Sequence, residues 1–178
     1  MIKIDKKKVE EALGKRLQMK VFAWGLDCAS RTGWASCTAD KDYLYIDCGF
    51  IDVDSKDIYF KYNQILKSLT SLFSGLNTDL AYKLIIEDTF FGRNINALKM
   101  LSRIGMIAYI TGKQAGIQDI SFIFPTSSRK AIGIKGTLKK PEVHKELTKI
   151  LGINLQDVDI CDAVVLALTG LVKTETIV

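Results

Sequence analysis

The hydrophobic positions of this chain fall into two kinds of pattern. Short apolar runs and period-two alternation, bounded by turn residues, are typical of buried strands. Five segments of this kind predict strands at residues 21–27, 33–39, 43–53, 81–87 and 120–124. The first three follow one another closely, and residues 39–42 suit a hairpin turn, so we expect an antiparallel meander.

Helical spacing, with apolar residues three or four apart, precedes, separates and follows these strands. It predicts helices at residues 6–17, 58–76, 95–114, 141–151 and 159–172. We predict a turn at 125–128 and a basic, glycine-containing loop at 129–140. Because a helix connects the third strand to the fourth, the fourth should return parallel to the first. The expected fold is α/β, with a five-stranded mixed sheet, three strands antiparallel and two parallel, flanked by helices.

Length and composition fit one globular domain. The chain has 178 residues, of which 48% are hydrophobic, which is enough to bury a real core. We expect a basic helical extension at residues 1–20, followed by one domain over 21–178. No apolar run approaches the ~20 residues of a membrane span, and the N-terminus lacks the apolar core of a signal peptide. A cytoplasmic protein without a membrane partner is therefore expected, with its 4 cysteines as reduced thiols.

Charge is segregated along the chain. The net charge is +5, but residues 21–92 carry −4 and residues 93–149 carry +8. A basic segment beside an acidic one suggests a polyanion held next to metal-binding carboxylates. The simpler alternative is a solvated basic surface, because lysine commonly serves solubility.

Four acidic residues stand at the ends of predicted elements that are distant in the sequence. Asp27 ends the first strand, Glu87 ends the fourth, and Asp159 and Asp162 open the last helix on one face. A single such residue is ordinary, because aspartate caps turns and favours helix N-termini. All four together favour a shared site, because acidic residues from three distant segments could meet there, and carboxylates suit Mg²⁺.

Four motifs carry a resemblance to a known family: GLDCASRTGW at 25–34, IEDTFFGRN at 86–94, IGIKGTLKK at 132–140 and DICDA at 159–163. Their order and spacing resemble the RuvC family of Holliday-junction resolvases, especially its short phage-type branch. The first loop is one residue shorter than in the bacterial enzymes, and residues 1–20 have no counterpart there.

This resemblance implies an RNase H-like fold and a structure-selective endodeoxyribonuclease that cuts four-way DNA junctions. It implies that the catalytic and metal-binding residues are Asp27, Glu87, Asp159 and Asp162, with two Mg²⁺ or Mn²⁺ ions per site. It also places Phe90 where the family carries an aromatic wedge, with Phe91 as the neighbouring candidate, and an exposed aromatic can stack on any base. The candidates for phosphate contacts are Arg93, Arg129, Lys130, Lys135, Lys139 and Lys140.

A homodimer is expected, because resolving a junction requires paired cuts on two strands. One face of the predicted helix 95–114 is the candidate interface, with Leu98, Leu101, Ile104 and Gly105. The alternative is that this face belongs to the ordinary core.

Other functions remain open at this point. A related nuclease acting on RNA or another branched nucleic acid would share the metals, and the family that trims ribosomal RNA precursors is one example. A non-catalytic junction-binding protein would share the fold, although crowded like charges without a use cost stability. The actin-like ATPases fit less well, because the chain is too short for their duplicated domain. No small-molecule substrate is expected.

Overall fold

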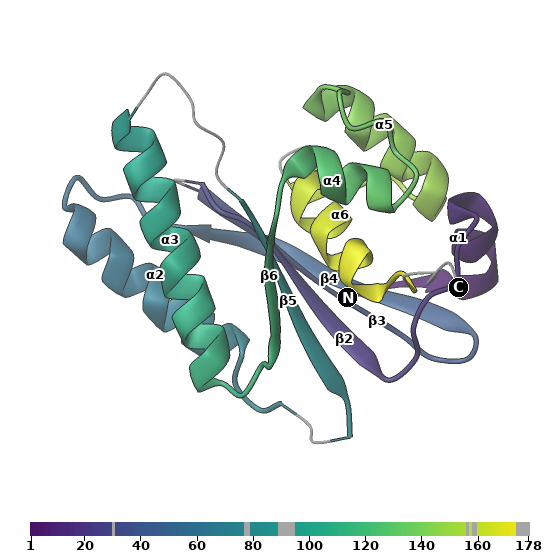
Figure 1. The fold of residues 1–178 in the computed structure, drawn as a ribbon, viewed down its shortest axis with the longest axis horizontal. Coiled ribbons are helices and arrows are strands. Elements are labelled where there is room, and N and C mark those ends of the chain that lie inside the picture. Colours follow the sequence, from purple (N-terminus) through teal and green to yellow (C-terminus); the bar gives the residue numbers. More distant parts are fainter. Residues whose placement is uncertain (30, 77–78, 89–94, 156, 158–159, 174–178) are drawn as a thin grey trace.

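The structure is a computed structural model that describes residues 1–29, 31–76, 79–88, 95–155, 157 and 160–173. In these residues one mixed sheet has the strand order β1-β4-β3-β2-β5-β6 (Figure 1). The strands are β1 (Ile2–Asp5), β2 (Val21–Asp27), β3 (Arg31–Ala39), β4 (Tyr43–Asp52), β5 (Ala81–Glu87) and β6 (Asp119–Ile123). The helices are α1 (Lys6–Leu13), α2 (Ile58–Leu72), α3 (Ile95–Gln114), α4 (Pro125–Ala131), α5 (Lys140–Leu151) and α6 (Ile160–Leu171).

The sheet lies between two layers of helices. Helices α2 and α3 cover one face, and α1, α4, α5 and α6 lie on the other (Figure 1). Strands β2, β3 and β4 form the predicted antiparallel meander, and β5 and β6 continue the sheet in parallel with β2. The predicted α/β architecture is therefore confirmed, with one strand more than expected.

The additional strand is β1, which pairs antiparallel with β4 at the sheet edge. Four residues are too few for a reliable alternation pattern, so the strand was absent from the sequence prediction. The helix predicted to reach residue 17 ends at Leu13, because Gly14 adopts a left-handed conformation with φ of 62°. Val9 and Leu13 are buried in the main core, so residues 1–20 pack against the rest of the molecule.

The turn and loop predicted over residues 125–140 were partly wrong, because α4 occupies Pro125–Ala131. Proline, threonine and serine favour turns, but proline also suits the first helical position. Tertiary packing selects the helix here. The Ser128 side chain is buried, and its backbone carbonyl accepts a hydrogen bond from Thr169 Oγ1 of α6 at 3.1 Å.

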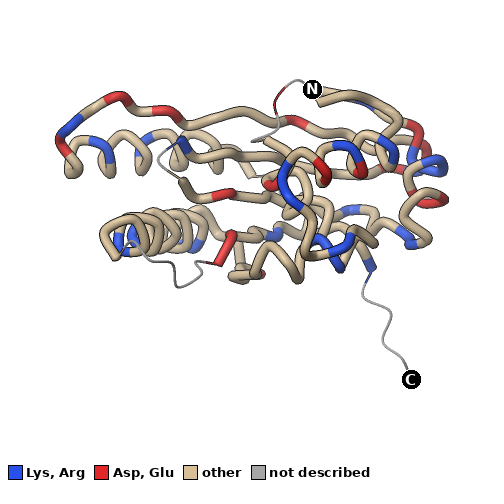
Figure 2. Tube along the Cα trace, turned by 90° about the horizontal axis from the view of Figure 1, so that it is seen from above, with Lys and Arg blue, Asp and Glu red and all other residues tan. Residues whose placement is uncertain are grey.

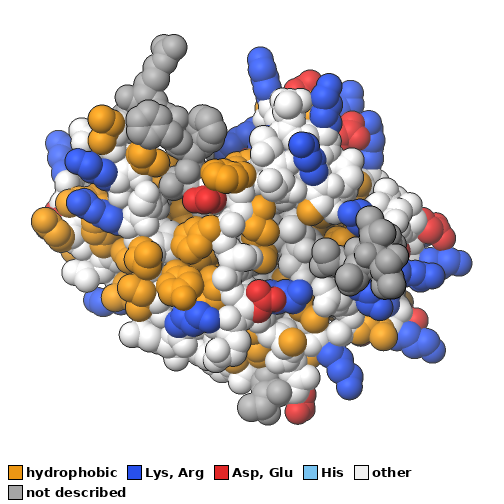
Figure 3. Space-filling view, viewed as in Figure 1, with side chains coloured by type: hydrophobic (Ala, Val, Ile, Leu, Met, Phe, Trp, Pro, Cys, Tyr) orange, Lys and Arg blue, Asp and Glu red, His pale blue; other side chains and the backbone are white. Residues whose placement is uncertain are grey.

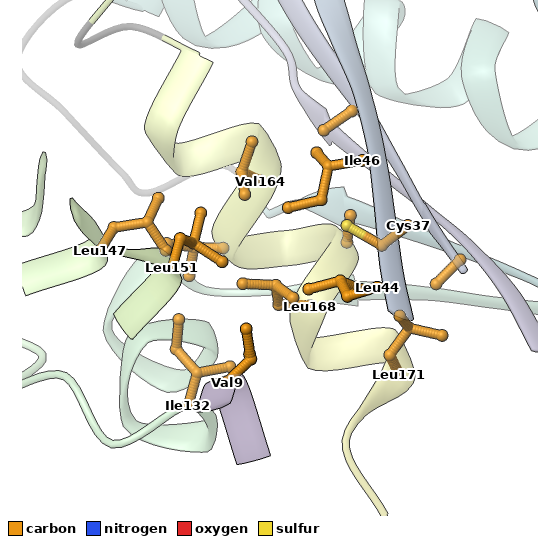
Figure 4. Close-up of a cluster of buried hydrophobic side chains, with 14 of the residues drawn as sticks. Val9, Cys37, Leu44, Ile46, Ile132, Leu147, Leu151, Val164, Leu168 and Leu171 are labelled. Atoms are coloured by element: carbon orange, nitrogen blue, oxygen red, sulfur yellow. The ribbon is translucent and has the colours of Figure 1, made fainter. Parts of the chain in front are cut away.

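The larger core lies between the sheet and α6. Nearly every side chain of α6 is buried, and Val164, Leu168 and Leu171 pack with residues of β3, β4, α1 and α5 (Figure 4). The helix comes very close to β2 at Gly25, where an added Cβ would lie 2.2 Å from the Ala163 carbonyl oxygen. This close approach fixes the start of α6 above the end of β2.

The opposite face of the sheet has a more aromatic core. Trp24 packs against Phe73 at 5.4 Å between ring centroids, and α2 and α3 close the cluster. Of the described helices, none has the length and apolarity needed to cross a membrane.

Candidate active site

Two acidic residues are brought together by the parallel pairing of β2 and β5. Leu26 lies opposite Ile86 in this ladder, so Asp27 and Glu87 follow at the same level on the two strands. Side chains alternate between the faces of a sheet. Asp27 therefore points to the same face as Gly25, which is the face that α6 covers.

Helix α6 supplies the third acidic residue from its first turn. Asp162 is buried, and the contact between α6 and Gly25 holds the helix start over the end of β2. One carboxylate oxygen from each of Asp27, Glu87 and Asp162 lies within 4.8 Å of the other two. The structure thus gathers three of the four predicted acidic residues, and Asp159 lies outside the described residues.

Two cations contact this cluster from the basic part of the chain. Lys140 Nζ lies 3.3 Å from Asp27 Oδ2 and 3.5 Å from Asp162 Oδ2. Arg129 Nη2 donates a hydrogen bond to Asp162 Oδ1 at 2.8 Å. Among the described residues, three carboxylates therefore face two positive side chains.

The pKa of Glu87 is raised at this site. Burial, and then the nearby Asp27 and Asp162 carboxylates, raise it to about 8 against the opposing effect of Lys140 and Arg129. In the metal-free protein at neutral pH, Glu87 therefore keeps a proton. A divalent cation among these carboxylates would supply the missing positive charge, and a set of hard oxygen ligands suits Mg²⁺ or Mn²⁺. The residues fit such an ion.

The cysteine beside the cluster is not a candidate nucleophile. Cys28 is buried, and burial raises the pKa of its thiol far above the ordinary range, with a further increase from Asp27 and Glu87. Because the thiolate is the reactive form, this thiol stays protonated and unreactive. All four cysteines are free.

The predicted basic residues separate into two groups. Lys130, Lys135 and Lys139 are exposed to solvent, where phosphates can reach them. Arg129 is only 9% exposed and Lys140 contacts two of the acidic residues, so both side chains are directed at the cluster. Three other predicted DNA-contacting residues lie outside the described residues: Phe90, Phe91 and Arg93.

Sequence patterns missed two features of the site. Arg129 was predicted as a candidate for a phosphate contact, because a basic side chain in a basic segment gives no sign that it turns inward. Arg31 was part of a recognised motif, but no partner was predicted for it. Its guanidinium contacts Asp157 at 3.3 Å and lies 3.4 Å from the Phe50 ring centroid, so it connects β3, β4 and the residues before α6.

Comparison with known proteins identifies relatives of this arrangement. Residues 24–170 match the profile of the family described as crossover junction endodeoxyribonuclease RuvC. The structure of Thermus thermophilus RuvC has a TM-score of 0.68 at 15% identity, over 83% of this chain and 92% of that one. The same organism's RuvC in complex with a Holliday junction substrate gives 0.67 at 15% identity, over 83% and 91%. Among curated proteins, no sequence matches this chain.

Proposed function

The chain belongs to the RuvC family of crossover junction endodeoxyribonucleases, and we propose that it resolves four-way DNA junctions at a metal site built on Asp27, Glu87 and Asp162. The observation that supports this most is the convergence of three carboxylates, from β2, β5 and α6, at one end of the sheet. We assign Asp159 as the fourth ligand because it precedes Asp162 by three residues in the sequence.

We propose two Mg²⁺ or Mn²⁺ ions at this site. Such ions activate the attacking water and stabilise the leaving oxygen of a phosphodiester. The three carboxylates would hold them, and Glu87 must release its proton for an ion to bind, so metal binding becomes stronger as pH rises. Lys140, between Asp27 and Asp162, offsets part of the negative charge that would otherwise repel a phosphate.

The exposed lysines beside the site are proposed to hold DNA backbones. Lys135 and Lys139 belong to the segment that leads directly into Lys140 and the cluster, and Lys130 lies on the adjoining α4. Figure 2 shows Lys and Arg at many places along the chain, with Asp and Glu among them. Lysine contacts to phosphates position DNA without reading its sequence. Base stacking is assigned to Phe90 or Phe91, and a further phosphate contact to Arg93.

We propose a homodimer, with an interface on α3 that excludes two of the four residues predicted for it. Ile104 and Gly105 are buried inside the chain's own core, so they are not available to a second copy. An apolar surface does lie over α3 and β6 (Figure 3), where Met106, Ile110 and Phe122 are 51%, 47% and 40% exposed. Two copies joined across this surface would present two active sites for paired cuts.

The dimer can be tested with one charged substitution. Ile110→Glu should shift the sedimentation coefficient of the wild-type dimer to that of a monomer, because it buries a charge in an apolar interface. Leu66→Glu, on the exposed side of α2, is the matched control and should leave the dimer intact. A wild-type protein that is monomeric both alone and on a junction would contradict the proposal.

The function is tested by cleavage of defined substrates. The purified protein should cut a synthetic four-way DNA junction in Mg²⁺, with paired cuts on opposed strands, and should not cut it in chelator. Linear and forked DNA of the same sequence should be cut much less. Preferential cutting of RNA would favour the RNA-directed alternative, and binding without cutting in both Mg²⁺ and Mn²⁺ would favour a non-catalytic role.

A further inference from the structure

Arg129 occupies an unusual place for a residue of a basic, DNA-facing segment. It lies near the end of α4, with 9% of its surface exposed. Its guanidinium is therefore directed into the molecule and not toward solvent, which argues against a contact with a DNA phosphate. The contacts that it makes inside define a different role.

The first contact is with one oxygen of Asp162. Arg129 Nη2 binds Oδ1 at 2.8 Å, whereas Oδ2 of the same carboxylate lies 3.5 Å from Lys140. Lys140 also contacts Asp27, so Oδ2 is the oxygen on the side of the acidic cluster. Arg129 thus binds Oδ1 and fixes the rotation of the carboxylate, with Oδ2 turned toward Lys140 and Asp27.

The second set of contacts is with the segment 132–139. Arg129 Nη1 donates to the Leu138 carbonyl at 2.9 Å and to the Gly136 carbonyl at 3.5 Å. Gly136 packs so tightly against α4 that an added Cβ would lie 2.7 Å from the Thr126 carbonyl oxygen. The backbone that carries the exposed Lys135 and Lys139 is therefore held by the same guanidinium that orients Asp162.

From these contacts we infer that Arg129 is a positioning residue that orients Asp162 for metal binding and holds the DNA-facing segment 132–139 against the site. This inference rests on the proposed metal-dependent function. A planar fork of donors is suited to binding a carboxylate and two carbonyls at once, which a lysine ammonium cannot reproduce in the same geometry. Groups that orient metal ligands commonly change metal affinity 10–100-fold when they are removed.

Mn²⁺ titration without DNA, followed by the electron paramagnetic resonance of the free ion, tests the inference. Arg129→Met and Arg129→Lys should both bind Mn²⁺ about 10–100-fold more weakly than wild type. Electrostatics alone predicts the opposite for Arg129→Met, because the substitution removes a positive charge beside the site. Arg16→Met is the matched control, since Arg16 also pairs with one carboxylate but is remote in sequence from the site.

Thermal unfolding of each variant checks that it is folded, and its unfolding midpoint should lie above the temperature of the titration. If Arg129→Met does not fold, the Mn²⁺ affinity of Arg129→Lys alone tests the inference. This variant keeps the positive charge and loses the planar set of guanidinium donors. Mn²⁺ affinity equal to wild type in a folded Arg129→Lys would overturn the inference. The proposed function fails separately, if wild-type protein binds no Mn²⁺ or does not cut a junction.

Junction binding in chelator distinguishes positioning from direct contact. We expect Arg129→Lys to bind the junction more weakly with an unchanged salt dependence. The number of phosphate contacts stays the same, but the lysines that make them are placed less well. If Arg129→Met lowers the slope of log affinity against log salt by about 0.9 and leaves Mn²⁺ affinity unchanged, Arg129 is a phosphate ligand and the inference is wrong.

Discussion

Two buried acidic sites in this molecule make different use of arginine. Near the N-terminus, Glu10 is 8% exposed, and its two oxygens accept hydrogen bonds from the Leu17 backbone N–H at 2.8 Å and from Arg16 at 3.2 Å. One negative charge meets one positive charge, and each oxygen has a donor. The protein itself thus supplies the hydrogen bonds and the opposite charge for this carboxylate. These contacts fix the end of α1 to the residues that follow.

The cluster at the ends of β2 and β5 is not balanced in this way. One carboxylate oxygen from each of Asp27, Glu87 and Asp162 lies within 4.8 Å of the others. Burial, and then the charges of Asp27 and Asp162, raise the pKa of Glu87 to about 8 against the opposing effect of Lys140 and Arg129. The comparison shows that a buried carboxylate is not by itself a functional sign. Among the described residues, the feature that distinguishes this cluster as a candidate cation site is the gathering of three carboxylates in one place.

Glycine substitutions beside the two sites should give the largest difference in stability. Gly25→Ala would force α6 away from β2, because its Cβ would lie 2.2 Å and 2.4 Å from backbone atoms of α6. We expect a loss of about 3 kcal/mol in the free energy of unfolding, together with loss of cleavage. Gly14→Ala, after α1, meets no atom within 4 Å and should cost only about 1 kcal/mol for its left-handed backbone. Urea unfolding measures both, and equal losses would contradict this account of the α6 contact.

Lysine substitutions test which region holds DNA. Replacing Lys135 and Lys139 together with alanine should reduce the slope of log junction affinity against log salt by about 1.8, or 0.9 for each phosphate contact. The same double change at Lys7 and Lys8, which lie on α1 beside the balanced site, is expected to leave the slope unchanged. Binding is measured in chelator between low and moderate salt. An identical reduction by both pairs would mean that DNA binding is not confined to the region beside the acidic cluster.

The raised pKa of Glu87, caused first by burial and then by its acidic neighbours, predicts a pH effect on stability. Between about pH 4.5 and 8, metal-free folded protein keeps a proton on Glu87 that the unfolded chain releases. The folded state then binds more protons, so the free energy of unfolding falls as pH rises through this window. Urea unfolding in chelator at pH 6, 7 and 8 should show a smaller decline for Glu87→Gln than for wild type. Addition of Mn²⁺ should reduce the decline in the free energy of unfolding of the wild type. An equal decline for the two proteins in chelator would show that the proton on Glu87 is not its cause.

Much of this site could be predicted because its acidic residues occupy ends of strongly patterned elements. The apolar runs before Asp27 and Glu87 predict buried strands, and a helical crossover predicts that these strands are parallel, so their ends meet. Ile104 and Gly105 could not be separated from an interface in the same way, because core and interface helices have the same apolar spacing. Only the packing of α3 against the sheet shows that these two residues are buried.

Other parts required the tertiary structure. Strand β1 is too short for a recognisable alternation and depends on pairing with β4. Helix α4 has a turn-like composition and depends on packing against α6. The inward direction of Arg129 depends on where Asp162 and the carbonyls of 136 and 138 lie, and these come from parts of the chain that no local pattern connects.

Junction cleavage by proteins altered at one carboxylate of each site tests the central claim most directly. Asp162→Asn keeps the shape of a candidate metal ligand and removes its charge, and Glu10→Gln makes the corresponding change at the balanced site. Under single-turnover conditions in Mg²⁺, Asp162→Asn should lose about a thousand-fold or more in rate while still binding the junction, since several kcal/mol of metal-dependent stabilisation is lost. Glu10→Gln should cut close to the wild-type rate. Undiminished cleavage by folded Asp162→Asn would show that the clustered acidic residues are not the catalytic site.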